Sequence, residues 1–137
     1  MTLIAQPAEQ TIPLAPLILV MLSLSGAAVA LVAMGVLGAR RRIGPNELFG
    51  IRTRYTRSSD AAWYAVHEAC ARWSVLAGLA FLPAVVLTPL VSDPDAQTVA
   101  ILGPVSAGML LLITGLRRGH RLARERLARE EGRADLP

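Results

Sequence analysis

Residues 13–39 read PLAPLILVMLSLSGAAVALVAMGVLGA, a run of 27 residues without a charged side chain, and three consecutive arginines follow at positions 40–42. A helix needs roughly 20 apolar residues to cross the hydrocarbon core of a bilayer, so this run can span it. A cleaved signal peptide normally carries positive charge before its apolar stretch. Because no arginine or lysine precedes Arg40, we predict an uncleaved transmembrane helix.

Two further uncharged runs, residues 73–92 and 96–116, are separated by the turn-forming sequence Asp93-Pro94-Asp95. Each is about 20 residues long, which again matches the thickness of a bilayer. Membrane helices tolerate residues that disturb helical hydrogen bonding, because neighbouring groups satisfy the freed carbonyls. We expect such residues to bend or locally unwind these two helices: Pro83, Pro89 and the pair Gly103-Pro104. The predicted fold class is an all-α membrane protein with three transmembrane helices.

The composition indicates one membrane domain, residues 1–137. Hydrophobic residues make up 53% of the chain and charged residues 18%, and the mean hydropathy is +0.47. A soluble domain of this size would have too little polar surface to cover such a core. No ionisable side chain lies inside the three runs, which argues against a stand-alone transporter. The single cysteine, Cys70, cannot form an intramolecular disulfide, and no Cys/His cluster has zinc-ligand spacing, so we expect neither metal nor cofactor.

The distribution of arginine predicts how the chain is oriented in the membrane. All 14 basic residues are arginines, of which seven lie in residues 40–72 and seven in residues 117–137. The one charged residue of the tail before Pro13 is Glu9. The charged residues of the turn between the second and third runs are both aspartates. Arginine-rich loops stay on the cytoplasmic side. We therefore expect a plasma-membrane protein with its N-terminus outside and both arginine-rich segments, with the C-terminus, in the cytoplasm.

Small residues on the predicted helices indicate where they pack, since helices in lipid associate through close backbone approach. The first run offers Ser23, Gly26, Ala27, Ala30 and Ala33, and the third offers Gly103, Ala107, Gly108 and Gly115. We interpret these faces as the seams of a three-helix bundle. A homo-oligomer formed through them is the alternative.

Residues 43–72, IGPNELFGIRTRYTRSSDAAWYAVHEACAR, form the polar segment between the first two runs. Its first half contains the turn-forming sequence Gly44-Pro45-Asn46, then Gly50, and the stretch Ile51 to Thr56 has no helical period. Glycine permits backbone conformations that other residues resist. This half is therefore predicted to be an ordered loop or a short extended piece.

The second half of the segment is predicted to be a short amphipathic helix. Ser58 or Ser59 can cap it, and Asp60 lies in its first turn, where a negative charge is favourable. Its apolar residues recur at spacings of three, four and three: Trp63, Val66, Cys70 and Trp73. We expect this helix to lie in the cytoplasmic interface or to pack beneath the bundle, with Trp63, Tyr64 and Trp73 near headgroup depth, and to continue into the second span.

An ordered string runs through this segment: Pro45-Asn46, Phe49-Gly50-Ile51-Arg52-Thr53, Thr56, Ser59, Ala62-Trp63 and His67. The string resembles the SdpI family of small bacterial membrane proteins, whose founding member is a bacteriocin immunity protein. The resemblance covers roughly residues 38–80. Two places depart from it: Ile43-Gly44-Pro45 is looser than the family's Ile-Pro-Pro-Asn opening, and Glu68-Ala69-Cys70 replaces a more basic, glycine-containing continuation. The larger immunity protein also carries extra N-terminal helices that have no counterpart among the three predicted here.

Polar side chains of the string offer a binding site at the cytoplasmic interface. Arg52 presents a planar fork suited to a carboxylate or phosphate, and Asp60 and His67 lie seven residues apart on one helical face. Neutral hydrogen-bonding groups lie nearby: Asn46, Thr53 and Thr56. The functional interpretation is a site for a lipid headgroup, a peptide or a protein partner. The structural alternative is that Arg52 pairs with Asp60 or with helix carbonyls to fix the loop, while Asn46 caps a turn.

We predict no catalytic residue. A histidine ordinarily has a pKa near neutrality, but His67 has no serine or cysteine partner at a recognisable spacing, and Cys70 is expected to be a small packing residue. Arg40 to Arg42 are expected to anchor the first helix by reaching the headgroups. The tail, residues 117–137, carries seven arginines and four acids, a net charge of +3, with oppositely charged residues four apart. This favours a helix attracted to anionic lipid, and nothing indicates nucleic-acid binding.

The leading hypothesis is a non-enzymatic bacterial membrane protein that acts as an immunity, sensing or accessory factor through residues 40–72. Its expected partners are membrane lipids and either a peptide toxin or a membrane or cytoplasmic protein. Arg52→Ala or Trp63→Ala should then abolish protection or partner binding without loss of membrane insertion. The alternative is an accessory subunit of a transporter or other complex, or an interfacial lipid-handling protein that uses Asn46, Arg52, Asp60 and His67.

Overall fold

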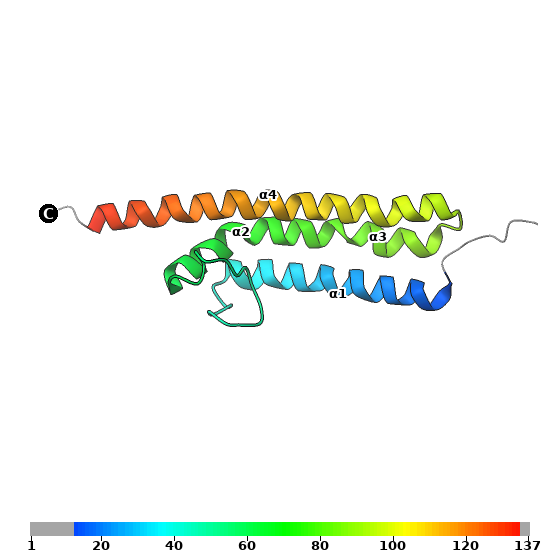
Figure 1. Ribbon diagram of the computed structural model, residues 1–137, viewed down its shortest axis with the longest axis horizontal. Coiled ribbons are helices and arrows are strands. Elements are labelled where there is room, and N and C mark those ends of the chain that lie inside the picture. Colours follow the sequence, from blue (N-terminus) through cyan, green and yellow to red (C-terminus); the bar gives the residue numbers. More distant parts are fainter. Residues whose placement is uncertain (1–12, 135–137) are drawn as a thin grey trace, which may run out of the picture.

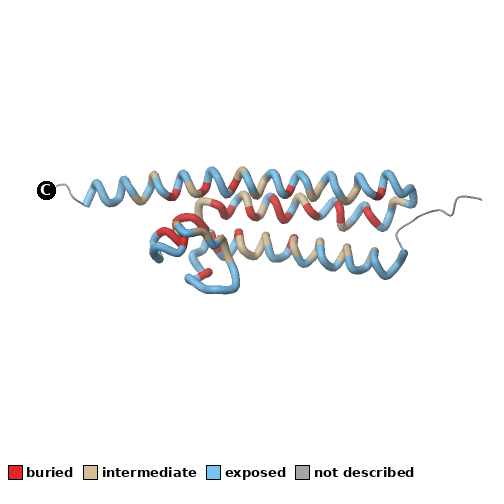
Figure 2. The backbone as a smooth tube through the Cα atoms, in the orientation of Figure 1, coloured by how far each residue is buried: buried red, intermediate tan, exposed pale blue. Residues whose placement is uncertain are grey.

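The computed structural model describes residues 13–134, and the N-terminal tail, whose location outside the membrane is predicted above, lies outside this range with residues 135–137. The chain forms α1 (Leu14–Ala39), α2 (Asp60–Ala80), α3 (Leu82–Leu87), the short 3-10 helix η1 (Thr88–Leu90) and α4 (Pro94–Ala134). Figure 1 shows three rods side by side, with α2 and α3 between α1 and α4. The buried residues concentrate on this middle rod (Figure 2).

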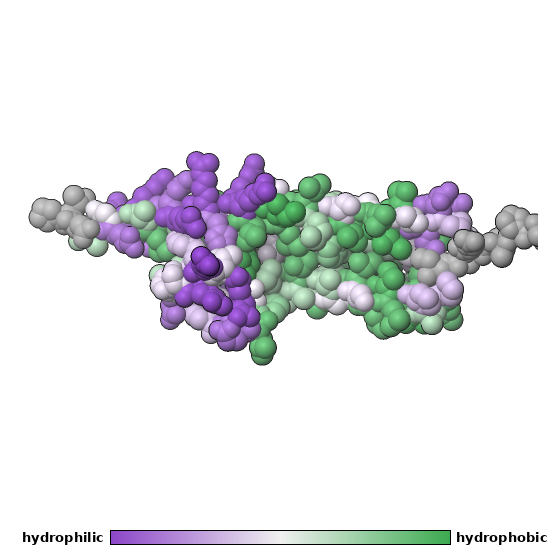
Figure 3. Space-filling view, viewed as in Figure 1, coloured by the Kyte–Doolittle hydropathy of each residue, from purple (hydrophilic) through white to green (hydrophobic). Residues whose placement is uncertain are grey.

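The three rods are each long and apolar enough to cross a membrane: Leu14–Ala39, Asp60–Leu90 and Pro94–Ala134. Many of their leucines and valines point outward, including Leu19 and Leu110, which are about two-thirds exposed. Figure 3 shows a hydrophobic band along the rods between hydrophilic ends. Such a surface requires lipid around it, so the prediction of an all-α protein with three transmembrane helices is confirmed. α4 continues past Leu116 to Ala134, which confirms that the tail extends the third span as a helix.

The prolines of the second span act as predicted, whereas the proline of the third does not interrupt its helix. α2 ends at Ala80, and α3 begins at Leu82 with Pro83 in its first turn, where the missing N–H costs nothing. Pro89 lies in the 3-10 turn η1. α4 runs without a break through Pro104, so the local unwinding predicted at Gly103-Pro104 is wrong. Membrane helices accommodate an isolated proline by small local adjustments.

Glycines form the helix seams, although not all of those expected. A Cβ placed on Gly108 or Gly115 of α4 would lie 2.4 Å from Phe81 Cε1 or 2.2 Å from Trp73 Cβ, so both glycines lie against the middle rod as predicted. A Cβ at Gly26 or Gly103 would meet nothing within 4 Å. The seam assigned to these two glycines is therefore wrong within the described part of the chain. α1 instead uses Ala28, Gly35 and Gly38, which are its buried residues.

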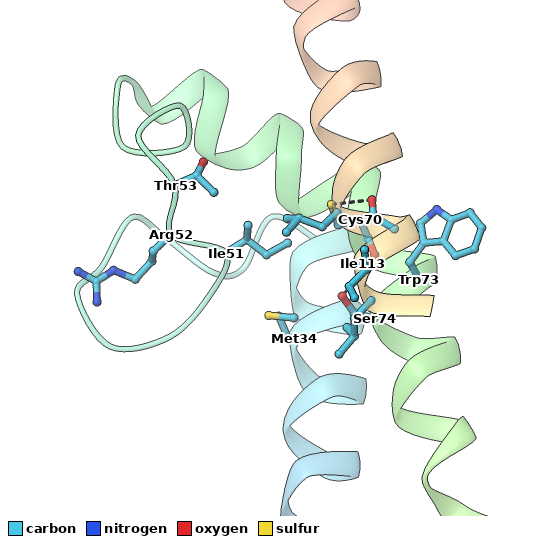
Figure 4. A pocket seen from close by; sticks show the side chains of 11 residues that line it. Met34, Ile51, Arg52, Thr53, Cys70, Trp73, Ser74 and Ile113 are labelled. Atoms are coloured by element: carbon cyan, nitrogen blue, oxygen red, sulfur yellow. Dashed lines mark hydrogen bonds between the residues drawn. The ribbon is translucent and has the colours of Figure 1, made fainter. Parts of the chain in front are cut away.

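The first turns of α2 run at an angle to the remainder of the helix (Figures 1 and 4). The apolar face of these turns packs on the chain itself: Ala65, Val66 and Cys70 form a buried cluster with Ala123 of α4. Trp63 is 2% exposed, so the chain itself covers its ring. The chain itself therefore covers the apolar face of these turns.

Candidate functional site

The α1–α2 loop, residues 40–59, begins with a tight reversal of the chain at the end of α1. The N–H of Arg42 donates to the carbonyl of Leu37 at 2.9 Å, and the N–H of Arg41 donates to that of Gly38 at 3.1 Å. This pair of bonds is the Schellman motif, in which one residue adopts the left-handed conformation. That residue is Arg41, with φ of 52°. A non-glycine residue there is strained, and the Arg41 side chain forms an ion pair with Glu68.

Asn46 organises the turn that follows. Its Nδ2 donates to the carbonyls of Gly44 at 2.8 Å and Phe49 at 3.0 Å, and its Oδ1 accepts from the N–H groups of Leu48 at 2.9 Å and Phe49 at 2.7 Å. An asparagine amide can fill both roles, because it carries two donor hydrogens and an acceptor oxygen with two lone pairs. Asn46 therefore closes the loop tip, as the structural alternative proposed. Pro45 precedes it and fixes the backbone entering the turn.

His67, Trp63 and Gly50 form the node that fixes the loop to α2. The N–H of Ile51 donates to His67 Nε2 at 2.8 Å, and His67 Nδ1 lies 2.8 Å from the carbonyl of Trp63. Trp63 Nε1 donates to the carbonyl of Ile43 at 2.9 Å. Gly50, with φ of +124°, lies so close that a Cβ there would be 2.5 Å from His67 Nε2 and 3.1 Å from Trp63 Cζ2. Four members of the family string therefore contact one another: Gly50, Ile51, Trp63 and His67.

These contacts define the protonation state of His67. Because Nε2 accepts a hydrogen bond, the proton of the neutral ring must be on Nδ1, which donates to the carbonyl of Trp63. His67 lies before the uncharged part of α2, and desolvation lowers its pKa, with a smaller opposing effect from the bond to Trp63. A second ring proton would point at the N–H of Ile51 and break that bond.

The thermal stability of the purified protein is expected to fall as the pH drops below about 6.5, the ordinary pKa of a histidine. The pKa of folded His67 is lowered, so the unfolded chain takes up a proton that the folded chain does not bind. The measurement is the melting temperature in neutral detergent across this pH range, for wild type and His67→Gln. Desolvation also lowers the pKa of His120, so His120→Gln is the control. A decline that is equally steep without His67 would contradict the assignment.

The two threonines and Ser59 complete the loop. The Thr53 N–H donates to Thr56 Oγ1 at 2.8 Å, and the Thr56 hydroxyl, in a side chain that is 1% exposed, donates to the carbonyl of Ile51 at 2.8 Å. Ser59 accepts from the N–H of Ala62 at 3.1 Å, and it is the N-cap of α2. The predicted cap is confirmed at Ser59. The hydroxyl groups of Thr56 and Ser59 are thus hydrogen-bonded to the backbone.

The structural alternative, in which Arg52 pairs with Asp60 or with helix carbonyls, is wrong for Arg52. Its guanidinium pairs instead with the carboxylate of Glu47 and donates to the carbonyl of the same residue. Glu47 lies five residues away on the loop tip, so the pair closes the tip from the other side of Asn46. Asp60 is exposed in the first turn of α2, where its charge faces the positive helix end. Sequence spacing along α2 could not reveal a partner that lies on the loop.

Glu68 links α2 to α4 and to the loop residue Arg41 just after α1, a role that the sequence analysis missed. Its carboxylate lies 3.0 Å from the guanidinium of Arg41 after α1 and 3.3 Å from that of Arg126 in α4. Partial burial alone would raise the pKa of Glu68, but the hydrogen bonds from both arginines outweigh it, and the pKa lies below its ordinary value. One of the three presumed headgroup anchors is therefore a partner of α2. The signal available in the sequence was Glu68 itself, an acid in a segment otherwise rich in arginine.

A cavity of about 320 Å³ opens where the loop meets the bundle. Its wall comes from four elements, namely Met34 of α1, Ile51 to Thr53 of the loop, Cys70, Trp73 and Ser74 of α2, and the stretch around Ile113 of α4. Figure 4 shows Ile51 directed at the helices and the Arg52 guanidinium pointing away from them. Cys70 Sγ donates to the carbonyl of Gly115 at 3.5 Å, which fits a packing residue. The cavity is therefore mainly apolar, with polar groups at its rim.

The structure does not gather the polar string into a reactive centre. Among the described residues, no hydrogen bond or ion pair joins any two of Asn46, Arg52, Asp60 and His67. No cluster of three or more His, Cys, Asp or Glu residues that could hold a metal was found within residues 13–134. The string instead builds a rigid loop whose tip, Leu48 and Phe49, faces outward.

Comparison with known proteins identifies one family. The model of the SdpI/YfhL protein family matches residues 42–116, a range that begins in the α1–α2 loop and includes the second and third spans. No curated protein and no solved structure matches the chain.

Proposed function

The chain belongs to the SdpI/YfhL protein family, and on that premise we propose that it is a non-enzymatic immunity or sensing protein that binds an apolar peptide segment at the tip of its α1–α2 loop. The single observation that carries the proposal is Leu48. Its side chain is 96% exposed, on a tip that Asn46 and the Arg52–Glu47 pair hold in place. A leucine held rigidly in the open loses nothing further in backbone entropy when a partner covers it.

The polar side chains of the string are already hydrogen-bonded within the protein, which supports binding rather than catalysis. A general base or nucleophile needs a free group within reach of a substrate. His67 uses both ring nitrogens, and the hydroxyl of Thr56 is buried and bonded to the backbone. Two apolar side chains face outward at the loop tip, since Phe49 beside Leu48 is 37% exposed.

The position of the cavity favours a partner that arrives from the membrane. The volume of about 320 Å³ is at the lower end of the range of roughly 300 to 1,000 Å³ that is typical of ligand sites. Met34 and Ile113 in its wall belong to the uncharged runs, so one side of the cavity lies at membrane depth. An apolar peptide in the inner leaflet could place a side chain there and contact the loop tip. Membrane-active peptide toxins have this chemistry.

The experiment is complementation of a deletion strain of the source bacterium, scored for survival against secreted peptides and for envelope stress. Wild type should restore protection, and Leu48→Asp should accumulate normally in the membrane but lose it. Leu122→Asp is the matched control, because Leu122 is a leucine of α4 rather than of the loop and is 49% exposed. Arg52→Ala is expected to weaken protection by loosening the tip. Trp63→Ala tests only folding, because that side chain is buried.

Full protection by Leu48→Asp would contradict the proposal. So would a wild-type gene that restores no resistance. In that case native mass spectrometry after gentle detergent purification separates the alternatives, since a co-purifying transport protein would support an accessory subunit and a retained lipid would support lipid handling.

A further inference from the structure

A second cavity, of about 390 Å³, lies between the α1–α2 loop and the start of the α4 tail. Its lining is basic and contains no acid: Thr53, Arg54, Tyr55, Leu116, Arg117, His120 and Arg124. We call this feature the arginine groove. Its lining shares Thr53 and Leu116 with the wall of the first cavity but includes neither Leu48 nor Phe49 of the loop tip.

Among residues 13–134, no ion pair neutralises the arginines of the groove. The ion pairs among residues 13–134 involve Arg41, Arg52, Arg121 and Arg126, and none includes the three arginines of the groove. Two acids of α2 and α4 are engaged elsewhere, because Glu68 pairs with Arg41 and Arg126, and Glu125 pairs with Arg121. Three guanidinium groups around one hollow repel one another unless an anion lies between them.

Aromatic contacts hold the groove in shape. The guanidinium of Arg124 lies over the ring of Tyr55, 4.7 Å from its centroid, and the ring of His120 is 5.9 Å from the same ring. His120 Nε2 is buried and has no hydrogen-bond partner among the described groups. Buried polar atoms of this kind normally have a partner. Desolvation, followed by the charge of Arg124, lowers the pKa of His120, so a nearby negative charge would favour the protonated ring.

We propose that the arginine groove is a binding site for a phosphate group. Guanidinium forks match the tetrahedral oxygens of phosphate in geometry and charge, and they bind it by charge-assisted hydrogen bonds. Leu116, the last residue of the third uncharged run, borders the groove, which places it at the level where lipid phosphates lie. The phosphate can come from the headgroup of an anionic phospholipid or from a free phosphate in solution, and both present the same chemistry.

The test uses the full chain in two arms. In the first, the protein is reconstituted in nanodiscs of phosphatidylcholine with a minor fraction of phosphatidic acid, then extracted gently, and retained lipid is measured by native mass spectrometry. In the second, the melting temperature in neutral detergent is followed while inorganic phosphate replaces chloride at constant ionic strength, since a ligand that binds the folded state stabilises it. The site variant is Arg117→Gln/Arg124→Gln. The control, Arg129→Gln/Arg133→Gln, removes the same charge further along α4.

Wild type is expected to retain phosphatidic acid or to be stabilised by inorganic phosphate. The site variant should reduce that retention or the apparent affinity at least about tenfold, because two charge-assisted bonds are lost, whereas the control should change it less than about twofold. Retention of lipid alone identifies a headgroup site, and a response to inorganic phosphate identifies a site open to free phosphate. Equal losses in both variants, which indicate general attraction to negative charge, or no binding by wild type, would overturn the proposal.

Discussion

Gly50→Ala is expected to destabilise the protein by about 3 to 5 kcal/mol, the sum of backbone strain and overpacking. With φ of +124°, Gly50 has a conformation that residues with a side chain rarely adopt. The new methyl group would also lie 2.5 Å from His67 Nε2 and 3.1 Å from the ring of Trp63. Relief of this overlap must displace His67, which then loses the N–H of Ile51. The measurement is the amount of protein in the membrane together with its unfolding free energy in detergent.

Gly44→Ala is the matched control in the same loop. A Cβ there would meet only Tyr64 Oη, at an ordinary 3.7 Å. Its effect should stay within about 0.5 kcal/mol, as for most surface changes. If Gly50→Ala behaved like this control, the fit between the loop and α2 described here would be wrong.

Gly35→Ala is expected to cost about 3 kcal/mol and to separate α1 from the middle rod. The added methyl group would lie 2.6 Å from the carbonyl oxygen of Ala71 and 2.5 Å from Val75 Cγ2. A side-chain tip could move aside, but the backbone of α2 is fixed by its own hydrogen bonds. The helices must therefore move apart along the seam, and in lipid no hydrophobic drive between helices offsets the lost contacts. Unfolding in detergent and cysteine cross-linking between α1 and α2 would both report the change.

Gly26→Ala tests the same substitution on the same helix where nothing lies within 4 Å. It should leave stability unchanged or raise it slightly, since alanine restricts the unfolded chain more than glycine does. A large loss at Gly26 would mean that a second copy of the chain covers that face. That outcome would support the homo-oligomer considered from the sequence.

The sequence predicted the membrane helices because the property that identifies them is local. A run such as residues 13–39 must satisfy its backbone polar groups internally once it is in lipid, and only a helix does this in one segment. The cap at Ser59 and the family string could be identified from the sequence for the same reason, because each is defined by residues close together in the chain. The interruptions at Pro83 and Pro89 were predicted correctly, whereas the local unwinding expected at Pro104, in the middle of a long helix, does not occur.

What the string does could be decided only in three dimensions. Whether His67 is free or engaged depends on the N–H of Ile51, 16 residues away, and whether Arg52 faces Asp60 or Glu47 depends on the path of the loop. Small residues identify close contact but not its direction, so Gly26 was assigned to a seam that Gly35 and Gly38 occupy.

The sequence by itself determined that this chain crosses a membrane three times and carries a family-specific segment between the first two crossings, because hydropathy and residue order are properties of single stretches. The tertiary structure decided that this segment is a hydrogen-bonded loop closed on His67 and Trp63. It also decided that Glu68 links α2 to α4 and to Arg41 just after α1, and that three arginines from two distant segments surround one hollow. Contacts of this kind depend on how helices are rotated and placed against one another, which no local pattern in the chain specifies.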